Sequence, residues 1–499
     1  MEYFNSEMVK TLHDCKNDRF VAYVGDNKHV LIDKIGRVVS DGYYEIKPRK
    51  GGFFVAKKSS WSDAETLLTS DGKEILVGAK KIHSFSDDGV ALVEKPDGSK
   101  VWFSKEGSLF GGEFADIGTF SGGFGCVMRD DGKWTYVDRQ FEMSENAYDI
   151  VTPFFGDYAY VIDSGKCFVI DKSLKVLSGP YDKILFIDSE NKLVAAQKRN
   201  PETNETSYCY FSVDGKQIGG DYHMVHGFVN GRSRVLKKVP SKTQNGKTET
   251  LTYFIDLQGN EISSTGFSMA GNFGKNVTYA GGVDSETGDF SFTIMFKNGM
   301  ISNEWYPYVG EEVDGMIPIM KGSSSYYYDI QKGKTVSKGF KRLSGVSEGV
   351  AHFESSKDKY KFLDIENRDF RVFGEGFDVV HNFSGGYGVV KNGENYDAIR
   401  KNEIALSQIS SWAQAIEQTP IVVLNLPEEL LSDTEIAYLL SCHAIEVLDF
   451  ALQSETFDDI SKAQFQSDKK MIEVLKLKLA SSLPQKTFDS EEDFYEFNF

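Results

Sequence analysis

The sequence predicts a mainly β protein, made of about eleven tandem β-hairpin units of roughly 35 residues and a small α-helical C-terminal domain. A short motif recurs at steps of 33 to 44 residues. Within each copy, apolar residues alternate with period two between turn-forming residues, as in paired short strands. The chain has 499 residues and 47 glycines, and no glycine follows Gly393. Hairpin turns need glycine and helices avoid it, so the fold class changes near residue 400.

The motif is a predicted strand that often ends in aspartate, and its clearest copy occupies residues 133–138. We expect Trp134, Tyr136 and Val137 in this copy to be buried or partly buried. The final positions of the successive copies are Asp33, Thr69, Ser104, Asp138, Asp171, Ser212, Asp256, Phe296, Asp329, Asp364 and Arg400. An aspartate before a turn commonly accepts hydrogen bonds from its own backbone, so we interpret these aspartates as turn formers and not as catalytic carboxylates.

A second phrase precedes the motif strand in several units. It occupies residues 85–93, 120–127 and 383–390, with a looser copy at 346–353. A turn opens the phrase, alternating apolar and small residues follow, and another turn leads into the motif strand. Each unit is therefore predicted to be a β-hairpin with one further short strand.

Three units are longer than the others. Their extra polar residues lie at 199–206, 240–250 and 281–286. We predict lengthened surface loops there, because such loops cost a repeat array little.

The number of units bears on the architecture of the array. Ordinary propellers have about four to eight blades of roughly 40–45 residues. Eleven shorter units favour an open or superhelical β array. A closed ring, or two β-propellers side by side, is the alternative.

The two phrases together resemble the repeat of the bacterial WG-repeat family, in which a Phe-Ser-x-Gly-x-Ala-x-Val limb precedes Lys-Trp-Gly-Tyr-Ile-Asp-x-x-Gly. The resemblance covers about residues 20–406 and is closest at 133–138, where Thr135 replaces the family's glycine. Elsewhere the tryptophan is replaced by His29, Cys167, Tyr208, Phe292, Tyr360 or Tyr396. The resemblance implies a bacterial protein with binding surfaces rather than a defined reaction.

Composition predicts four segments. They are an N-terminal cap segment (1–19), the repeat array (20–406), a helical domain (407–486) and an acidic aromatic tail (487–499). Residues 401–499 hold 18 acidic residues and 7 lysines, so they carry −11 of the formal net charge of −18. Acidic and basic residues are therefore nearly balanced in the array, whereas the C-terminal end is strongly acidic.

The helical domain is predicted from apolar spacing and capping residues. Ser432 and Glu435 suit a capping box, Ser467 suits the start of a second helix that ends before Pro484, and residues 408–418 suit an earlier helix. The helix that follows Ser432 carries an apolar stripe of Ile436, Leu439, Leu440, Val447, Leu448 and Ala451, with His443 on the same stripe. The helix that follows Ser467 carries a stripe of Met471, Ile472, Leu475 and Leu479. The stripes either pack together and cap the last repeat, or form a dimerisation or docking module.

The tail combines five acidic and five aromatic residues in thirteen positions, without a base. We predict that Phe494, Tyr495, Phe497 and Phe499 bind a partner protein. The tail resembles the acidic, Phe-ended tail with which single-stranded-DNA-binding proteins recruit partners. A solubilising end, or a tail folded back on its own domain, is the alternative.

The sequence predicts neither catalysis nor a cofactor. His223 and His226 form the one close histidine pair, but they lie in a β unit, and we expect no metal there. Glycine-rich phrases do not open helices, so they are not phosphate loops. The acidity argues against direct binding of nucleic acid or of anionic membranes.

The chain is expected to be cytoplasmic. No apolar run suits a membrane span, and the first residues lack the features of a signal peptide. The five cysteines are scattered, odd in number and without metal-ligand spacing, as in a reducing compartment.

Two classes of function remain. The first is a non-catalytic scaffold whose repeats and tail bind other proteins. The second is a carbohydrate-binding module or carbohydrate-active enzyme with a loop-built site. Aromatic residues suited to stacking on sugars are Trp61, Trp102, Trp305, Tyr326 and Tyr327, although most repeat aromatics should fill the core. Exposed coplanar rings with two facing carboxylates would favour the second class.

Overall fold

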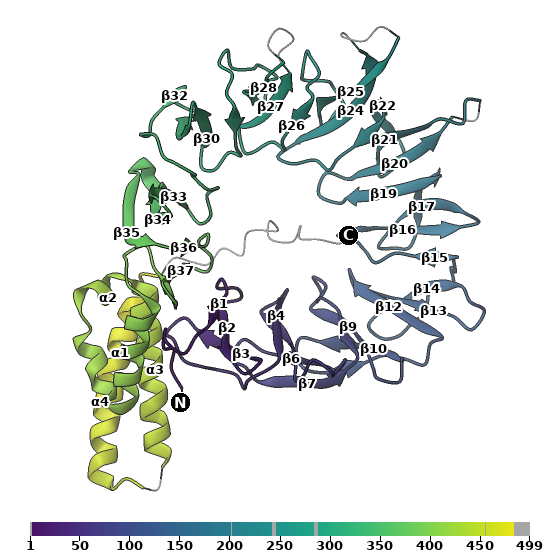
Figure 1. Cartoon of the computed structure of the whole chain (residues 1–499). Helices are drawn as coiled ribbons and strands as arrows, with labels where there is room; N and C mark the ends of the chain where they lie inside the picture. The colour runs from purple at the N-terminus through teal and green to yellow at the C-terminus, as the bar shows by residue number, and fades with distance from the viewer. Residues whose placement is uncertain (1, 201, 242–245, 284–287, 455, 484–499) are drawn as a thin grey trace. The chain divides into compact units, whose positions relative to one another are not determined.

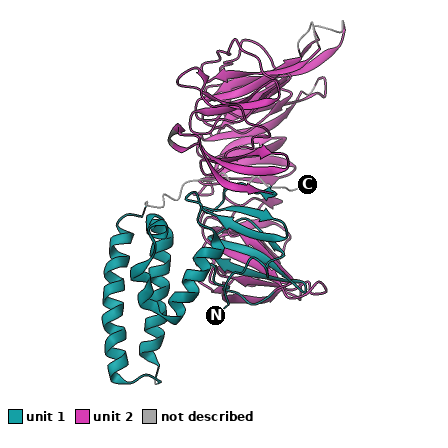
Figure 2. Ribbon diagram, turned by 60° about the vertical axis from the view of Figure 1, so that its left-hand side comes forward, with its two compact units in different colours: residues 1–42, 378–499 teal, residues 43–377 magenta. Residues whose placement is uncertain are grey.

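The computed structural model describes residues 2–200, 202–241, 246–283, 288–454 and 456–483. These residues form eleven small antiparallel sheets and then a group of helices (Figure 1). Each sheet contains one copy of the motif, so the predicted mainly β fold of tandem hairpin repeats is confirmed. We number the sheets as repeats 1 to 11 in chain order. Residues 1–42 and 378–499 form one compact unit, unit 1, and residues 43–377 form another, unit 2 (Figure 2).

Unit 2 contains repeats 2 to 10. Repeat 2 contains β4 (Glu45–Arg49), β5 (Phe53–Lys57), β6 (Glu65–Leu68) and β7 (Glu74–Ala79). Repeat 3 contains β8 (Lys81–Ile82), β9 (Val90–Glu94), β10 (Lys100–Ser104) and β11 (Leu109–Phe110). Repeat 4 contains β12 (Asp116–Ser121), β13 (Phe124–Met128) and β14 (Trp134–Val137). Repeat 5 contains β15 (Ile150–Val151), β16 (Tyr158–Asp163), β17 (Lys166–Asp171) and β18 (Val176–Tyr181). Repeat 6 contains β19 (Lys183–Asp188), β20 (Leu193–Arg199), β21 (Thr206–Ser212) and β22 (Gln217–Tyr222). Repeat 7 contains β23 (Met224–Val225), β24 (Arg232–Pro240) and β25 (Thr248–Asp256). Repeat 8 contains β26 (Met269–Ala270), β27 (Val277–Val283) and β28 (Phe290–Phe296). Repeat 9 contains β29 (Tyr308–Val309), β30 (Met316–Lys321), β31 (Ser324–Asp329) and β32 (Lys334–Thr335). Repeat 10 contains β33 (Val350–Ser356), β34 (Lys359–Asp364) and β35 (Arg371–Phe377), with a 3-10 turn at Glu366–Arg368.

Unit 1 contains repeats 1 and 11 and the helices. Its strands are β1 (Thr11–Leu12), β2 (Arg19–Gly25) and β3 (Lys28–Asp33), and β36 (Val379–Val380), β37 (Gly388–Asn392) and β38 (Asn395–Ile399). Its helices are α1 (Leu406–Gln418), the 3-10 helix Pro420–Asn425, α2 (Glu428–Ser432), α3 (Thr434–Gln453) and α4 (Asp459–Ala480).

The motif strand packs on both neighbouring repeats, as repeat 4 illustrates. In β14, Tyr136 and Val137 are 1% and 0% exposed and Trp134 is half-buried, which confirms the predicted burial. Val137 belongs to a core cluster with residues of repeat 3, and Tyr136 belongs to a cluster with residues of repeat 5. Successive side chains of a strand point to opposite faces, so one strand joins two sheets. Contacts of this kind are local, as expected for a repeat array.

The aspartates at the end of the motif strand form turns, as predicted. The carboxylate of Asp138 accepts hydrogen bonds from the backbone N–H groups of Gln140 and Glu142, both at 2.9 Å. The other described motif aspartates accept equivalent bonds from residues two to four positions later. The carboxylates are therefore used by their own turns.

The longest insertion differs from the predicted surface loop. In repeat 7, β24 and β25 are nine residues each, and Pro240 pairs with Thr248. Part of the insertion therefore extends the hairpin, because its residues alternate well enough to continue the ladder. Parts of all three predicted insertions lie outside the described residues, namely residue 201 of the first, 242–245 of the second and 284–286 of the third.

Two of the predicted helix starts were wrong. Asp433, and not Ser432, caps α3 by accepting from the backbone N–H of Ile436, because Ser432 is the last residue of α2 and its hydroxyl donates to the backbone carbonyl of Glu429. The last helix begins at Asp459 rather than near Ser467, with Asp458 as its cap. The predicted helix at 408–418 is confirmed as α1.

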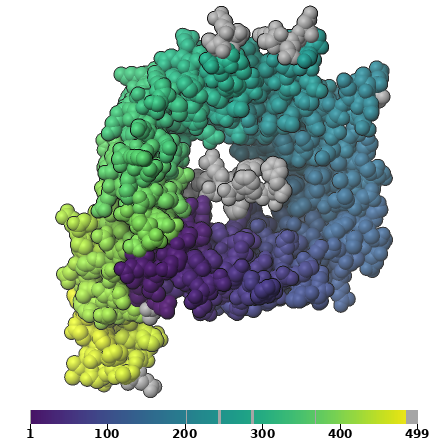
Figure 3. Space-filling model, viewed as in Figure 1, coloured from purple at the N-terminus to yellow at the C-terminus, as the bar shows by residue number. Residues whose placement is uncertain are grey.

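The helices pack on one another and on both terminal repeats, which extends the first alternative predicted for them. One core cluster includes Leu12 and Phe20 of repeat 1, Val389 of repeat 11, Ile409 of α1 and Leu440 of α3. Figure 3 shows repeat 1, in purple, against the yellow-green helices. By contrast, α4 leaves an apolar stripe exposed, which consists of Ile460, Met471, Val474 and Leu477. No described helix is long and apolar enough to cross a membrane.

Candidate functional site

The predicted partner-binding residues Phe494, Tyr495, Phe497 and Phe499 lie outside the described residues. Of the aromatic residues considered for sugar stacking, Trp102 and Tyr327 are fully buried, whereas Trp61 and Trp305 are exposed. Among the described residues, no group of three His, Cys, Asp or Glu side chains is arranged to hold a metal ion.

A pocket of about 420 Å³ lies in unit 2 where repeats 8, 9 and 10 meet. Its aromatic walls are Tyr279 from β27, Phe292 from β28 and Tyr308 from β29. The remaining lining residues are Met269, Val309, Gly310, Glu311, Val313, Pro318, Gly345 and Val346. This volume falls within the range of ligand sites.

The aromatic walls of this pocket, which we call the repeat 8–9 pocket, rest on glycine backbone. A Cβ atom at Gly271 would lie 2.4 Å from the Tyr279 ring, and one at Gly281 would lie 2.6 Å from the Phe292 ring. The Tyr279 and Phe292 rings have centroids 5.7 Å apart and cross at 83°. Both rings also pack against the core cluster of repeats 8 and 9, so these walls are formed before any ligand binds.

The third aromatic wall, Tyr308, and the lining residue Met269 are open to solvent at the mouth of the pocket. Tyr308 is 48% exposed and Met269 is 51% exposed. Both are the first residue of a two-residue strand whose second residue, Val309 or Ala270, is buried. A large apolar side chain at this outward position is available to a partner.

The pocket carries one carboxylate, that of Glu311, which has no hydrogen bond or ion pair within contact distance among the described residues. Its neighbour Glu312 instead accepts hydrogen bonds from the backbone of Asn276 and Val277 at 2.6 and 2.8 Å. Burial, followed by Tyr279 and Glu311, raises the pKa of Tyr308, so its phenol stays neutral. Glu311 therefore supplies a negative charge beside neutral rings.

Arg234 is a cation that interacts electrostatically with Tyr279 and Glu311. Its Nη1 donates to the carbonyl of Ala270 at 2.7 Å. Burial lowers the pKa of Arg234, against the influence of Tyr279 and Glu311. The Nε atom is buried and has no hydrogen-bond partner within the described part of the chain, so solvent does not reach it.

Sequence reasoning missed the repeat 8–9 pocket. A partial signal exists at the first residue of the short first strand, which is polar or charged in repeats 1 and 3 (Thr11, Lys81). This residue is apolar or aromatic in repeats 5, 7, 8, 9 and 11 (Ile150, Met224, Met269, Tyr308, Val379), so the signal marks an exposed apolar position and not the pocket itself. The signal becomes visible only after the strands are aligned by their pairing.

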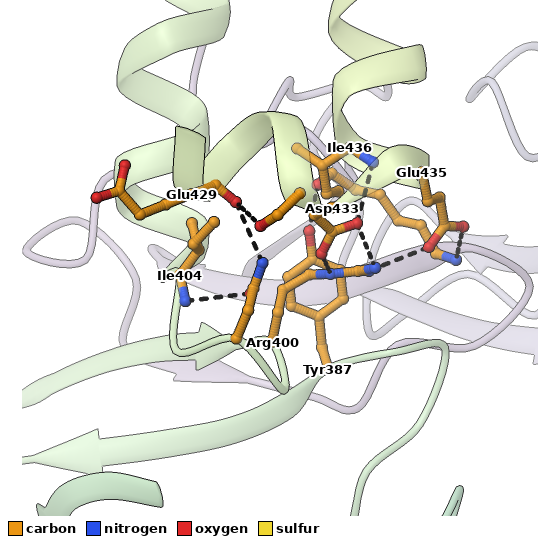
Figure 4. Close-up of polar contacts among 10 residues, drawn as sticks. Tyr387, Arg400, Ile404, Glu429, Asp433, Glu435 and Ile436 are labelled. Carbon is orange, nitrogen blue, oxygen red and sulfur yellow. Dashed lines mark hydrogen bonds and ion pairs between the residues drawn. The ribbon is translucent and has the colours of Figure 1, made fainter. Parts of the chain in front are cut away.

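A second group of polar residues, in unit 1, joins the helices to repeat 11 (Figure 4). Arg400 donates through Nε and Nη2 to the carboxylate of Asp433 at 2.5 and 2.8 Å, and its guanidinium lies 4.9 Å from the Tyr387 ring centroid. Glu435 contacts Arg400 at 3.1 Å and Lys34 at 2.8 Å. Although burial opposes the shift, Lys34 and Arg400 lower the pKa of Glu435. These charges satisfy one another, so we assign them to the fold.

Unit 1 also has a pocket of about 570 Å³ between the N-terminal residues, β2, β3 and α1. The three serine hydroxyls that α1 contributes are engaged within the fold. Ser407 donates to Asp397, Ser410 to the carbonyl of Phe4, and Ser411 to the carbonyl of Ser407. The repeat 8–9 pocket, with its preformed aromatic walls and the exposed Tyr308, is therefore the stronger candidate.

Comparison of the sequence with protein-family models and with curated proteins finds no match. A solved structure of a eukaryotic initiation factor is similar over 60% of this chain and 89% of its own, at 10% identity and a TM-score of 0.36. The tricorn protease is similar over 94% of this chain and 54% of its own, at 11% identity and a TM-score of 0.24. BamB from Moraxella catarrhalis is similar over 55% of this chain and 90% of its own, at 12% identity and a TM-score of 0.24. Scores this low support no transfer of function.

Proposed function

We propose that this protein is a non-catalytic scaffold for protein–protein interaction, with the repeat 8–9 pocket and the acidic aromatic tail as its two binding elements. The observation that carries the proposal is the exposure of Tyr308 and Met269 at the mouth of a pocket with preformed aromatic walls. Exposed apolar side chains around a pocket are typical of sites that receive a partner's side chain. The resemblance to WG-repeat proteins, whose repeats imply binding surfaces, agrees with this proposal.

The pocket geometry favours a protein partner over a carbohydrate. A sugar ring stacks on a flat aromatic face, and paired carboxylates would be needed to cleave a glycosidic bond. In the repeat 8–9 pocket, Tyr279 and Phe292 cross at 83°, and Glu311 is the only carboxylate that lines the described pocket.

The test is an affinity capture from the native host with the full chain, a Tyr308→Ala variant and a chain that lacks residues 487–499. We expect at least one protein to be captured by the full chain and lost with one of the two variants. Tyr44→Ala, which removes a similarly exposed tyrosine from unit 2, is the matched control. A set of captured proteins that is identical for all four chains would refute the proposed function.

A further inference from the structure

The inner side of the last helix, α4, is fully engaged within unit 1. Ile472 is completely buried in the core cluster. On the flank of the helix, Lys469 Nζ contacts the Asp449 carboxylate of α3 at 2.5 Å. Lys476 Nζ lies 5.6 Å from the ring centroid of Tyr438, also in α3. The apolar and charged groups on this side of α4 are therefore satisfied by the fold.

The outer side of α4 has apolar and cationic side chains that the fold does not use. Lys470 and Lys478 are exposed, and each lies four residues from Val474, so the three side chains share one face of the helix. Among the described residues, neither of these two ammonium groups makes an ion pair. The apolar residues of this side, which we call the α4 stripe, are 46% to 82% exposed. They are Ile460, Met471, Val474 and Leu477. Contiguous apolar side chains on an exposed helix face mark an interaction site, and the lysines require an acidic occupant.

A second copy of this chain does not supply the acids. Asp468 accepts a hydrogen bond from Gln464, and Glu473 lies 3.9 Å from Lys469, so both are engaged along α4 itself. Two α4 stripes face to face would bring lysine toward lysine. An anionic membrane is disfavoured as well, because residues 401–499 carry a net charge of −11.

The acidic aromatic tail of the same chain has the required composition and reach. Residues 487–499 contain five acidic and five aromatic residues and no base, and only residues 481–486 separate them from the end of α4. So short a connection keeps the tail near α4 at an effective concentration on the order of 1 mM. A segment of thirteen residues spans up to about 45 Å. The α4 stripe is about 26 Å long from Ile460 to Leu477, so the tail is long enough to follow all of it.

We infer that the acidic aromatic tail docks on the α4 stripe of its own chain. Its rings cover the apolar side chains, and its carboxylates pair with Lys470 and Lys478. The inference goes beyond the proposed function, because this contact forms without a partner, and a partner of the tail has to displace it. Denaturant releases so shallow a contact before the core unfolds, so the contact does not change the unfolding midpoint.

The test measures whether the chain's own tail competes with a free copy of it. A fluorescent peptide with the sequence of residues 487–499 is titrated into the full chain and followed by anisotropy. The second protein is the full chain with Phe494, Tyr495, Phe497 and Phe499 replaced by alanine, which we call the four-alanine chain. We expect the four-alanine chain to bind the peptide with a Kd on the order of 0.3 mM, and the wild type about five-fold more weakly, because its stripe is occupied. The two chains have the same net charge, so charge repulsion does not explain a difference.

Further substitutions in the four-alanine chain locate the binding site. Leu477→Asn should weaken the peptide about five-fold, because it removes apolar surface from the α4 stripe. Lys470→Gln should weaken it about three-fold, because it removes one ion pair. Lys462→Gln makes the same charge change on α4 away from the stripe and should leave the affinity unchanged. Circular dichroism of each variant verifies that the helices are intact.

Three results would each overturn the inference. They are equal affinity of the peptide for the wild type and the four-alanine chain, no binding by the four-alanine chain, and binding that Leu477→Asn leaves unchanged. A four-alanine chain that sediments as a dimer, and as a monomer with Leu477→Asn, would instead assign the stripe to a second copy.

The proposed function is judged separately from the docking of the tail. If capture from the host depends on Tyr308 or on the tail but the peptide does not bind α4, the scaffold role stands and the docking is wrong. If the peptide binds the α4 stripe but the captured proteins are identical for all chains, the docking stands and the scaffold role fails.

Discussion

The residue two positions before the end of the motif strand joins neighbouring repeats in the same way at several places. Trp102, Tyr136 and Tyr210 occupy this position, and each is 1% exposed or less. Each donates a side-chain hydrogen bond to a backbone carbonyl that lies 16 residues later, in the following repeat. One side chain therefore supplies both apolar burial and a polar link between two sheets.

We predict that Tyr136→Ala lowers the free energy of unfolding by about 3 kcal/mol, because it leaves a cavity between repeats 4 and 5. Tyr136→Phe should cost only about 1 kcal/mol, since it removes the 2.8 Å hydrogen bond to Thr152 and keeps the ring. Urea denaturation measures both, with Tyr44→Ala as an exposed control. An unchanged unfolding midpoint in Tyr136→Ala would contradict the assigned strand register.

The buried His443 makes unit 1 sensitive to acid. Burial, followed by Arg37, lowers the pKa of His443 below its usual 6.5. Its ring lies 3.2 Å from the carbonyl of Ala413 and 3.3 Å from Arg37 Nη1, an arrangement that suits the neutral imidazole. As pH falls below 6.5, the unfolded chain takes up a proton that the folded chain refuses, so this group contributes a loss of stability.

We therefore expect the stability of the wild type to fall more steeply between pH 7 and 5 than that of His443→Gln. His381, whose pKa Asp14 raises, has the opposite effect in this window, so the comparison between the two proteins isolates His443. Thermal unfolding across this pH range measures the difference. His223→Gln, at an exposed histidine, is the control, and parallel pH profiles of the wild type and His443→Gln would contradict the prediction.

At the scale of elements, the strand-to-helix junction of unit 1 depends on one arginine. Arg400 follows β38 directly and binds Asp433, the cap of α3, through two nitrogens. The side chains of Arg400 and Asp433 are 12% and 10% exposed. One ion pair therefore joins the helix cap to the last repeat. Because both side chains are largely buried, each charge depends on the other, and not on water, for its stabilisation.

Arg400→Ala should destabilise unit 1 by about 3–5 kcal/mol, because it leaves the Asp433 carboxylate buried without its cation. Arg400→Lys keeps the charge but not the two-nitrogen contact, so it should fall between the wild type and Arg400→Ala. Chemical denaturation followed by helical circular dichroism measures both changes. Arg129→Ala, at a more exposed arginine of unit 2, should change the helical signal little.

At the scale of the whole molecule, the tail is predicted to be separable from the fold. The described residues already form continuous core clusters in both units, and we predict that deletion of residues 487–499 leaves the unfolding midpoint unchanged. If the tail binds a partner, capture should weaken with added salt and fail when Phe497 and Phe499 become alanine, because charge steers the encounter and the rings supply burial. A captured partner that is insensitive to both changes would exclude the tail as its binding element.

Most of the repeat fold was predictable from the sequence because its determinants are local. The spacing of the motif gave eleven units, and the aspartates at positions such as 138 and 256 were recognisable as turn formers from the residues beside them. The helix caps at Asp433 and Asp458 were missed, because two neighbouring residues can each serve as a cap and the preceding element decides between them. The repeat 8–9 pocket was missed because its rings come from three strands up to 29 residues apart.

By itself, the sequence determined that this protein is an array of eleven β-hairpin repeats followed by helices, since alternation, turn residues and period are properties of short segments. Only the tertiary structure decided that the first repeat, the last repeat and the helices share one core, and that rings from three strands of repeats 8 and 9 line one pocket. Both facts depend on residues that are distant in the chain. Burial and register, which bring such residues together, are set by packing and not by local sequence.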